Sequence, residues 1–525
     1  MINYIIYSIA LVLSLLGIII LRLAYKTLKI YLTYKKKYGK DVKILFYPIM
    51  GIGYFMQQSF EKNDNSYEWM KRIVRENPNL KAIIILSGLF DYIILQDEKW
   101  VKNFSQDHIL YYKNDGNFGF TYAFEKGLFY SNFKDWKRQR IFLNSSFHFE
   151  SLKSYVPVVK EQTKKLLSNL KQEDGFVKLN IFEELTKITS EIITISYFGK
   201  SLVDVKCKSG VELYKENNDI IQDSYMYRFT SPYFILKACI FGAMKASTIL
   251  HNEAEKKLIA RMSDIVQTYE KIIDEEIEQI KKSKIGLKEI QPKTMIELYL
   301  KEYLIQQQNR TTMNPDDIFE KKEIIHQFLT FYFAGSETTS HLVAMTFYEL
   351  TKNKQIYDKL MKEINENVQD FDKVEHSDLS KFQYLDLVLK ETGRLHNAVA
   401  FTFPRVTDQD YTKEDMYLSK ELLVCHRLTQ YSQQCEVLKD SDEYIPERYN
   451  RNTKGFSSFD VIPFSTGPRN CIGQHLALIQ SKFLVIYFLK NFELKELAGY
   501  KLRTLQKHSN QPIDQELVLI SRKKI

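Results

Sequence analysis

Most of the chain has the spacing of apolar residues that is typical of amphipathic helices. Between about residue 136 and residue 390, apolar positions recur with helical periodicity, charged residues fill the positions between them, and prolines are rare. This spacing gathers the apolar side chains on one face of a helix. Residues 254–282 and 323–349 are long enough to predict helices well above ordinary length. We therefore expect the body of the protein to be mainly α-helical.

Short apolar and β-branched runs predict small β-sheets beside these helices. Residues 81–86 and 92–96 flank Gly88 and Asp91, as the two strands of a hairpin would. Strand-like runs return at residues 416–418, 422–424 and 516–520. We expect a fold that is mainly α with small β-sheets. No linker rich in proline, glycine or serine occurs after residue 70, so we expect residues 66–525 to form one catalytic domain.

The N-terminal segment differs from the rest of the chain. Residues 4–21 carry no charged side chain, and a helix of about 18 apolar residues is close to the length that crosses the hydrocarbon core of a bilayer. Basic residues follow at once, none precedes, and no signal-peptidase site is evident. We predict one uncleaved transmembrane helix within an anchor of residues 1–29, then a hinge of residues 30–65, with the catalytic domain facing the cytosol.

Composition and charge exclude several classes of function. The 525 residues are 44% hydrophobic and 14% aromatic, which is enough for a large core. The net charge of +9 comes from 74 basic and 65 acidic residues that are interleaved, and no Lys/Arg cluster alternates with aromatics. We therefore expect no nucleic-acid partner. The five cysteines are odd in number and lack CxxC spacing, so neither a disulfide framework nor a zinc site is indicated.

Cys471 is distinguished from the other cysteines by its surroundings. An apolar, helix-like run follows it, and the N–H groups at a helix start stabilise a thiolate, the form of cysteine that binds metals. Gly473 allows a flat ligand to approach the backbone, and Gly467 permits a tight turn before the sulfur. Arg469 can reach an anionic group on the same ligand. These features make Cys471 a candidate metal ligand rather than an ordinary buried cysteine.

Two pairs of residues have the spacing of partners on one helix face. Glu391 and Arg394 are three residues apart, which suits an ion pair in the geometry that arginine prefers. Trp136 and Arg140 are one helical turn apart. Either pair alone is also compatible with an ordinary amphipathic helix.

The segment from Ala334 to Thr339 interrupts a strongly helical pattern with poor helix formers. Gly335 and two successive threonines each cost up to about 1 kcal/mol relative to alanine in a helix interior. Such a departure from local preference suggests a functional site. Thr338 can return its hydroxyl to the carbonyl of Ala334, which would open the helix and leave space for oxygen and water.

These motifs resemble those of the cytochrome P450 superfamily. Its haem-binding signature, Phe-x-x-Gly-x-Arg-x-Cys-x-Gly, is matched at Phe464, Gly467, Arg469, Cys471 and Gly473, and the resemblance extends in order from about residue 70 to the C-terminus. It implies haem b as the cofactor and Cys471 as the axial ligand of its iron. It also implies that Phe464 packs near the sulfur, that Gly473 lies against the cofactor and that Arg469 binds a haem propionate.

The resemblance also assigns roles around the haem edge and below it. Trp136, Arg140 and Arg405 would face the propionates, with His426 as a further candidate for the same role. A structural network below the haem would consist of Glu391, Arg394 and Arg448, the last belonging to a Pro-Glu-Arg-Tyr element that resembles the family's Pro-Glu-Arg-Phe.

Within the interrupted helix, the resemblance implies cofactor contacts and a pair of catalytic residues. Ala334 and Gly335 would lie against the haem. Glu337 would be the acid that exchanges protons with solvent, and Thr338 the alcohol beside the bound oxygen. Since Ala334 stands where some fatty-acid hydroxylases of the superfamily carry an esterified glutamate, no covalent haem link is expected.

The activity implied is insertion of one oxygen atom from O2 into a hydrophobic substrate: a lipid, fatty acid, steroid or xenobiotic. No segment resembles a flavin or nicotinamide domain, so electrons from NADPH would come from a separate flavoprotein reductase, assisted by a cytochrome b5-like protein. The resemblance places the catalytic domain at the endoplasmic reticulum membrane. It implies a substrate pocket formed by residues 118–124, 221–229, 331–338 and 399–403.

Two alternatives remain open at this point. One is a haem-thiolate isomerase or peroxide-dependent enzyme, which would need no proton relay. The other is a non-catalytic haem sensor or carrier. The chain also departs from microsomal members, because its hinge keeps only Pro48 and no tryptophan occurs between residues 431 and 444.

Overall fold

The computed structural model describes residues 2–107, 120–147, 149–169, 177–178, 180–283, 285–428, 440–450, 461–506, 509–514 and 516–522, with the single residues 438 and 459. Helices dominate these residues, as the sequence predicts. They are α1 (Ile2–Tyr38), α2 (Ile52–Asn63), α3 (Glu68–Glu76), α4 (Glu98–Gln106), α5 (Phe133–Asn144), α6 (Phe149–Asn169), α7 (Ile181–Phe198), α8 (Leu213–Thr230), α9 (Pro232–Phe241), α10 (Ala243–Ala246), α11 (Glu253–Lys282), α12 (Met295–Gln308), α13 (Lys321–Lys352), α14 (Lys354–Asn367), α15 (Gln383–Leu395) and α16 (Gln474–Asn491).

The strands form small sheets at the edges of the helical body. They are β1 (Val42–Phe46), β2 (Ala82–Leu86), β3 (Tyr92–Leu95), β4 (Val177–Lys178), β5 (Tyr411–Lys413), β6 (Met416–Leu418), β7 (Leu423–His426), β8 (Phe492–Glu496), β9 (Thr504–Gln506), β10 (Asn510–Pro512) and β11 (Val518–Arg522). The largest sheet has the order β1-β2-β3-β7, and the others are β4-β11-β8, β9-β10 and β5-β6. In the first sheet β2 and β3 are antiparallel, with Ala82 opposite Leu95, so the predicted hairpin is confirmed.

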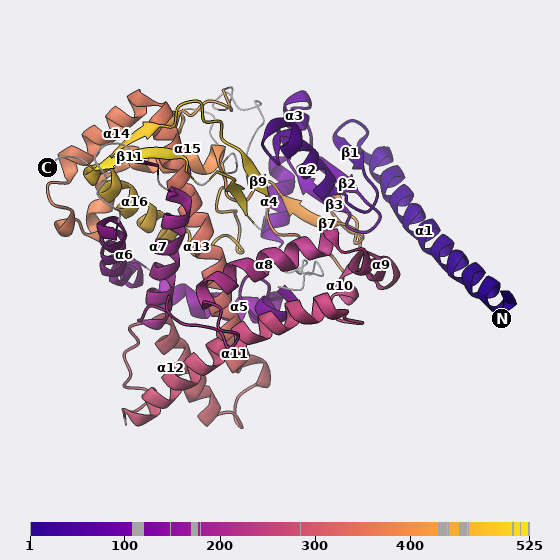
Figure 1. Cartoon of the computed structure of the whole chain (residues 1–525), viewed down its shortest axis with the longest axis horizontal. Helices are drawn as coiled ribbons and strands as arrows, with labels where there is room; N and C mark the ends of the chain where they lie inside the picture. The colour runs from indigo at the N-terminus through magenta and orange to yellow at the C-terminus, as the bar shows by residue number, and fades with distance from the viewer. Residues whose placement is uncertain are drawn as a thin grey trace.

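The helix α13 runs through the middle of the body, with α7 and α16 packed beside it (Figure 1). Most of its side chains between Ile324 and Leu350 are buried, because apolar and small residues occur on all its faces. The predicted long helices at residues 323–349 and 254–282 are confirmed as α13 and α11. At the start of α11, Asn252 accepts a hydrogen bond from the N–H of Glu255 and donates its own N–H to that side chain, which satisfies two backbone groups at the helix end.

The first helix continues past the predicted anchor and joins the folded body. Figure 1 shows α1 extending away from the other helices toward the N-terminus. Its C-terminal part packs against the first sheet, where Ile30 and Tyr34 are buried and the Tyr34 hydroxyl donates to the carbonyl of Tyr417 at 3.0 Å. Among the described residues, no helix has a stretch both long enough and apolar enough to cross a membrane, so the expected transmembrane span is not shown.

Residues 30–65, expected to be a hinge, contain regular structure instead. They comprise the end of α1, strand β1 and helix α2. β1 pairs in parallel with β2, with Val42 opposite Ala82, and Val42 is part of the buried core beneath the sheet. This pairing was not predicted from the sequence, because the apolar pattern of β1 is short and its partner lies far along the chain.

Candidate functional site

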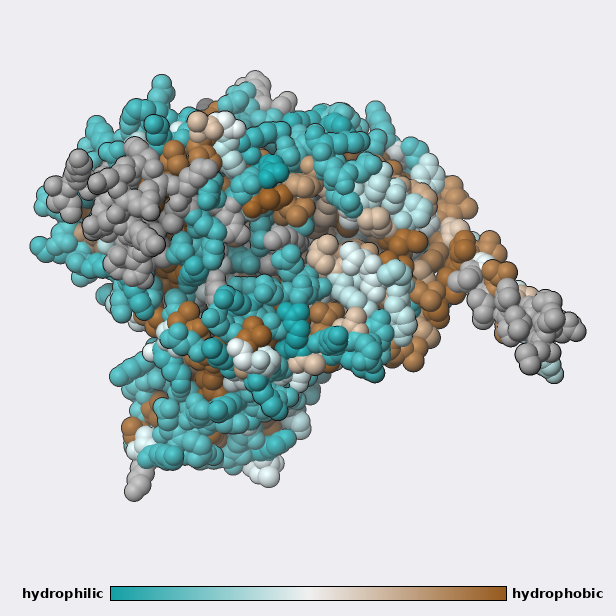
Figure 2. Space-filling model, viewed as in Figure 1, coloured by the Kyte–Doolittle hydropathy of each residue, from teal (hydrophilic) through white to brown (hydrophobic). Residues whose placement is uncertain are grey.

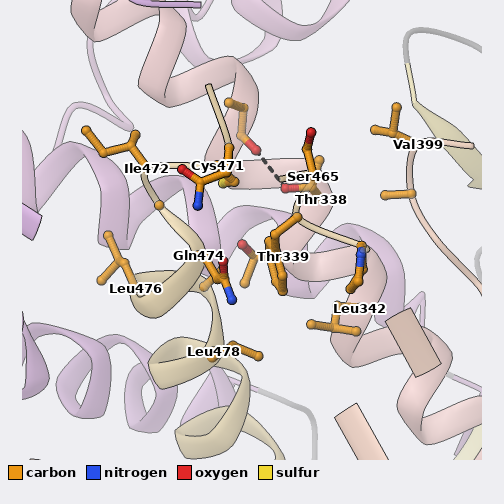
Figure 3. A pocket seen from close by; sticks show the side chains of 18 of the residues that line it. Thr338, Thr339, Leu342, Val399, Ser465, Cys471, Ile472, Gln474, Leu476 and Leu478 are labelled. Atoms are coloured by element: carbon orange, nitrogen blue, oxygen red, sulfur yellow. Dashed lines mark hydrogen bonds between the residues drawn. The ribbon is translucent and has the colours of Figure 1, made fainter. Parts of the chain in front are cut away.

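A cavity of about 750 Å³ lies between α13, the start of α16 and the segments before and after β7. It is lined by every residue that the sequence assigns to cofactor binding or oxygen chemistry except His426: Trp136, Arg140, Ala334, Gly335, Glu337, Thr338, Arg405, Phe464, Arg469, Cys471 and Gly473. Figure 3 shows Cys471 near the start of α16 and Thr338 on α13 contributing to the same pocket. The fold thus brings together residues from four distant parts of the chain.

Cys471 lies in the loop before α16, and the surface that it exposes lies in the cavity. Its backbone N–H donates to the carbonyl of Phe464 at 2.9 Å, which closes the loop. Burial among protein atoms raises the pKa of the thiol, while the N–H groups of Gly473 and Gln474 and the charge of Arg140 act in the opposite direction. A cation in the cavity would shift this balance toward the thiolate, which binds metals.

The turn before Cys471 requires glycine at position 467. Gly467 has a positive φ of 76°, and a Cβ added there would lie 2.6 Å from the carbonyl oxygen of Ser105 in α4. A side chain would therefore be strained by the backbone conformation and would also collide with α4. The predicted tight turn is confirmed, and it holds the cysteine loop against α4.

Arg469 is half-buried beside the cavity, and its hydrogen bonding is incomplete. Its guanidinium stacks on the Trp136 ring at 4.5 Å from the centroid, and its Nη1 donates to the carbonyl of Ser131 at 2.9 Å. Within the described part of the chain, its buried Nε and Nη2 atoms have no hydrogen-bond partner. Burial, and secondarily the charge of Arg405, lower the pKa of Arg469 to about 9. Such a cation is stabilised when an anionic ligand supplies the missing acceptors.

Two further arginines line the same cavity. Arg140 donates to the carbonyl oxygen of Asn470 at 2.7 Å and to its Oδ1 at 2.8 Å, and burial lowers the pKa of this arginine. Arg405 is buried and lies over the Phe104 ring, with its guanidinium carbon 4.9 Å from the centroid. The cavity therefore has a cationic side, away from its apolar walls.

The segment of residues 334–339 on α13 forms the predicted hydrogen bond, but the helix is not opened there as predicted. Thr338 Oγ1 donates to the carbonyl of Ala334 at 2.6 Å, shown by the dashed line in Figure 3. The helix nevertheless stays α-helical from Lys321 to Lys352. The structure also gives Gly335 a packing role, because a Cβ added there would lie 2.9 Å from Cδ1 of Ile193 in α7. Since its hydroxyl hydrogen points to Ala334, Thr338 presents lone pairs to the cavity and can accept a hydrogen bond there.

Direct proton exchange with bulk solvent would require Glu337 to lie at the protein surface, and it does not. The residue is only 8% exposed, and its Oε2 accepts hydrogen bonds from Ser509 Oγ at 3.0 Å and from Gln511 Nε2 at 2.5 Å. Both donors come from the segment around β10. These contacts are not predictable from the sequence, because a serine and a glutamine near the C-terminus form no recognisable pattern.

Glu391, on α15, accepts hydrogen bonds from several donors. Arg394 approaches it through two hydrogen bonds of 2.8 Å, and Arg448 Nε donates to it at 2.9 Å. The N–H of Ile445 and the hydroxyl of Tyr449 add bonds of 3.0 and 2.8 Å. Burial alone would raise the pKa of Glu391, but Arg394 and the other donors lower it overall. The predicted association of Glu391, Arg394 and Arg448 is thus present.

The predictions for His426 and for part of the pocket are not supported. His426 does not line the cavity: its Nδ1 bonds the carbonyl of Arg427 at 2.8 Å, its Nε2 lies 3.2 Å from Ser465 Oγ, and burial lowers its pKa to about 3. Residues 331–338 and 399–403 contribute to the wall, whereas residues 121–124 and 221–229 do not. Residues 118 and 119 and the side chain of Phe120 lie outside the described part. Lining residues not expected from the sequence include Phe129, Phe147, Ile193, Tyr197 and Met295.

The comparison with protein-family models matches residues 63–518 to the family described as "Cytochrome P450". The chain belongs to the cytochrome P450 family. Cytochrome P450 3A29 from Sus scrofa is 26% identical over 386 residues, which cover 73% of each chain. Lithocholate 6-beta-hydroxylase from Mesocricetus auratus is 25% identical over 386 residues, with the same coverage. Cytochrome P450 4e2 from Drosophila melanogaster is 24% identical over 455 residues, covering 85% of this chain and 81% of that protein.

Membership in this family implies a monooxygenase that uses haem iron, and the cavity of this P450 suits that cofactor. Its volume of about 750 Å³ lies in the range typical of cofactor and ligand sites. Cys471 presents a soft ligand to the cavity, and the buried Nε and Nη2 of Arg469 lack acceptors that a carboxylate could supply. The donor set therefore fits a flat iron cofactor with anionic side groups.

Proposed function

We propose that this P450 inserts one oxygen atom from O2 into a hydrophobic substrate, and that Cys471 would hold the iron of haem b. A separate NADPH-dependent flavoprotein reductase would supply the electrons, with a cytochrome b5-like protein as a second donor. The observation that carries the proposal is the meeting of the Cys471 thiol and the Thr338 hydroxyl on the wall of one cavity. A thiolate ligand favours O–O cleavage on haem iron, and that is the chemistry that the cofactor supplies.

The residues around Cys471 would hold and orient the cofactor. Arg469, Arg140 and Arg405 are the candidates for binding its two carboxylates, with the Trp136 ring packed under Arg469. Phe464 would pack near the sulfur. The other contacts proposed for the cofactor come from backbone or small side chains: Ala334, Gly335 and Gly473.

On the other side, Thr338 and Glu337 would control protons. Thr338 keeps its hydroxyl proton on the Ala334 carbonyl and so can accept a hydrogen bond from a water molecule in the cavity. Glu337 is the nearest acid along α13 and would exchange protons with that water. Aromatic side chains exclude bulk water from the remaining wall, among them Phe331, Phe333 and Phe403.

The substrate class that we propose is a lipid, fatty acid, steroid or hydrophobic xenobiotic. Most of the cavity wall away from the arginines is apolar, so a hydrophobic molecule would bury its surface there. One relative is named as a hydroxylase of lithocholate, and its 25% identity supports the class rather than the compound.

We further propose that the N-terminal part of α1 attaches the protein to the endoplasmic reticulum membrane, with the catalytic domain in the cytosol. Support comes from the uncharged residues 4–21 and from Arg22, Lys26 and Lys29, which follow them. Exposed apolar side chains such as Leu21 and Leu28 gather along α1 where it leaves the body (Figure 2). Deletion of residues 1–25 should move the protein from membrane to soluble fractions without loss of haem, and retention in membranes would contradict attachment through this segment alone.

The central proposal is tested by spectroscopy and turnover. The reduced protein with CO should show the red-shifted Soret band of thiolate-ligated haem, and Cys471→Ala should abolish it. Cys239→Ala is the matched control, because Cys239 lies on α9 and does not line the cavity. With reductase, NADPH and isotopically labelled O2, the product should contain one labelled oxygen atom. A normal band in Cys471→Ala would remove the ligand assignment, and turnover without O2 would indicate an isomerase or peroxide-dependent enzyme.

A further inference from the structure

The segment around β10 carries two polar side chains that converge on Glu337. Besides the two hydrogen bonds to Glu337 Oε2, Gln511 Nε2 donates to Ser509 Oγ at 3.2 Å, so the three side chains form a closed hydrogen-bonded group. All three are buried: Ser509 is 4% exposed, and Glu337 and Gln511 are each 8% exposed. A buried carboxylate is strongly destabilised without such donors, so these contacts help to determine where the carboxylate lies.

The same segment also contacts the cavity. Ser509 belongs to the cavity wall, and the N–H of Asn510 donates to the carbonyl of Ala398 at 2.7 Å, next to the wall segment 399–403. On its other side, β10 pairs with β9, with Asn510 opposite Gln506. The hairpin is therefore fixed both to the substrate side of the cavity and to its partner strand, which gives Ser509 and Gln511 a defined position from which to hold Glu337.

We propose that Ser509 and Gln511 are positioning residues for proton delivery, because they hold the Glu337 carboxylate at the cavity beside Thr338. The proposal rests on the monooxygenase function proposed above. Both donors are neutral, so they orient the carboxylate without supplying a fixed positive charge next to it. The Ser509 hydroxyl donates to Glu337 while it accepts from Gln511, so loss of either side chain also disturbs the other.

The reaction gives a direct measure of proton delivery. In productive turnover, RH + O2 + NADPH + H⁺ gives ROH + H2O + NADP⁺: the O–O bond breaks, one oxygen atom enters a C–H bond, and the other leaves as water with two protons. Without timely proton delivery the O–O bond survives, and O2 + NADPH + H⁺ gives H2O2 + NADP⁺. Both outcomes consume the two electrons of one NADPH. The ratio of peroxide released to NADPH consumed therefore measures how often proton delivery fails.

The test compares full-length holoenzyme variants with reductase and NADPH, using lithocholate, a fatty acid and a hydrophobic xenobiotic as probe substrates and taking the one that the parent protein oxidises. In Gln511→Met and Ser509→Ala, peroxide released per NADPH should rise, and product per NADPH should fall by about threefold or more, since small displacements of a catalytic group have large effects on rate. The reduced CO spectrum and the thermal unfolding temperature should stay close to those of the parent protein. Ser509→Thr keeps a hydroxyl at this position and should restore coupling.

Gln506→Met is the matched control. It makes the same substitution in the paired strand β9, where the Gln506 amide oxygen accepts a hydrogen bond from the Tyr67 hydroxyl. The hydrogen bonds to Glu337 from described side chains come from Ser509 and Gln511 instead. Its coupling should equal that of the parent. Unchanged coupling in both Gln511→Met and Ser509→Ala, or an equal loss in Gln506→Met, would overturn the inference. A parent protein that consumes no NADPH under any of these conditions would instead overturn the proposed function.

Discussion

Two groups of wholly or partly buried arginines differ in how their charge is balanced. In the support network, defined as Glu391, Arg394 and Arg448, the two guanidinium groups share one carboxylate and the carbonyls of residues 440, 441 and 443. Around the cavity, Arg140 and Arg469 form no ion pair within the described residues, and the pKa of each is lowered by burial. The support network is complete within the chain, whereas the cavity arginines are suited to an anion that the described residues do not supply.

This difference separates structural charges from ligand-binding charges on physical grounds. Removing one member of a satisfied buried network leaves its partners charged and unpaired, so the folded state is destabilised. Removing a buried cation that lacks hydrogen-bond acceptors removes a desolvation cost from the ligand-free protein, so the folded state is not destabilised. The cost of the substitution then appears as weaker ligand binding. The two groups should therefore respond to substitution in opposite ways.

The largest effect is expected for Glu391→Ala. It leaves Arg394 and Arg448 buried without their carboxylate, which typically costs about 3–5 kcal/mol of the free energy of unfolding. The variant should accumulate poorly and fail to retain haem, as measured by thermal unfolding and by haem content per protein. Glu366→Ala, on the exposed face of α14, is the control and should change stability by less than about 0.5 kcal/mol. A stable, haem-loaded but inactive Glu391→Ala protein would assign Glu391 to catalysis instead.

The same network predicts an acid-dependent loss of stability. Folding lowers the pKa of Glu391, so the native state holds fewer protons than the unfolded state near the ordinary glutamate pKa of about 4.3. The stabilising contribution is complete above that value and is lost as the pH falls through the lower pKa of the folded state. The difference in free energy of unfolding between the parent and Glu391→Gln should be constant above about pH 5 and shrink below about pH 4. A difference that does not change with pH would show that Glu391 does not titrate in this range.

The sequence predicted those elements and residues whose signals are local. The long helices α11 and α13, the β2–β3 hairpin and the loop around Cys471 are encoded by contiguous patterns, and the structure contains them. The Glu391–Arg394 pair was predictable for the same reason, because its members are one turn apart. Arg448 could be added only through the resemblance to a family.

Features that depend on distant parts of the chain were predicted poorly. The parallel pairings of β1 with β2 and of β3 with β7 join short strands that are far apart in sequence. The wall residue Ile193 and the contacts of Ser509 and Gln511 with Glu337 arise only when α7 and the C-terminal hairpin pack against α13. The family resemblance made His426 a further candidate for contact with the cofactor, but its ring nitrogens lie at Arg427 and Ser465.

A smaller effect, opposite in sign to the first, is expected for Arg469→Met. Methionine keeps much of the apolar contact with the Trp136 ring but removes a cation whose buried Nε and Nη2 lack acceptors in the described structure. The free energy of unfolding of the haem-free protein should therefore stay the same or rise by about 1 kcal/mol.

Haem affinity should fall about tenfold in this variant, since one charge-assisted hydrogen bond to a cofactor carboxylate corresponds to about 1.4 kcal/mol or more. Chemical unfolding of haem-free protein and the rate of haem transfer to apomyoglobin measure the two quantities separately. Arg72→Met, at an exposed position on α3, should change neither. If Arg469→Met instead lost more than about 2 kcal/mol without haem and retained haem normally, Arg469 would belong with the support network, and incomplete hydrogen bonding would not distinguish ligand-binding arginines in this protein.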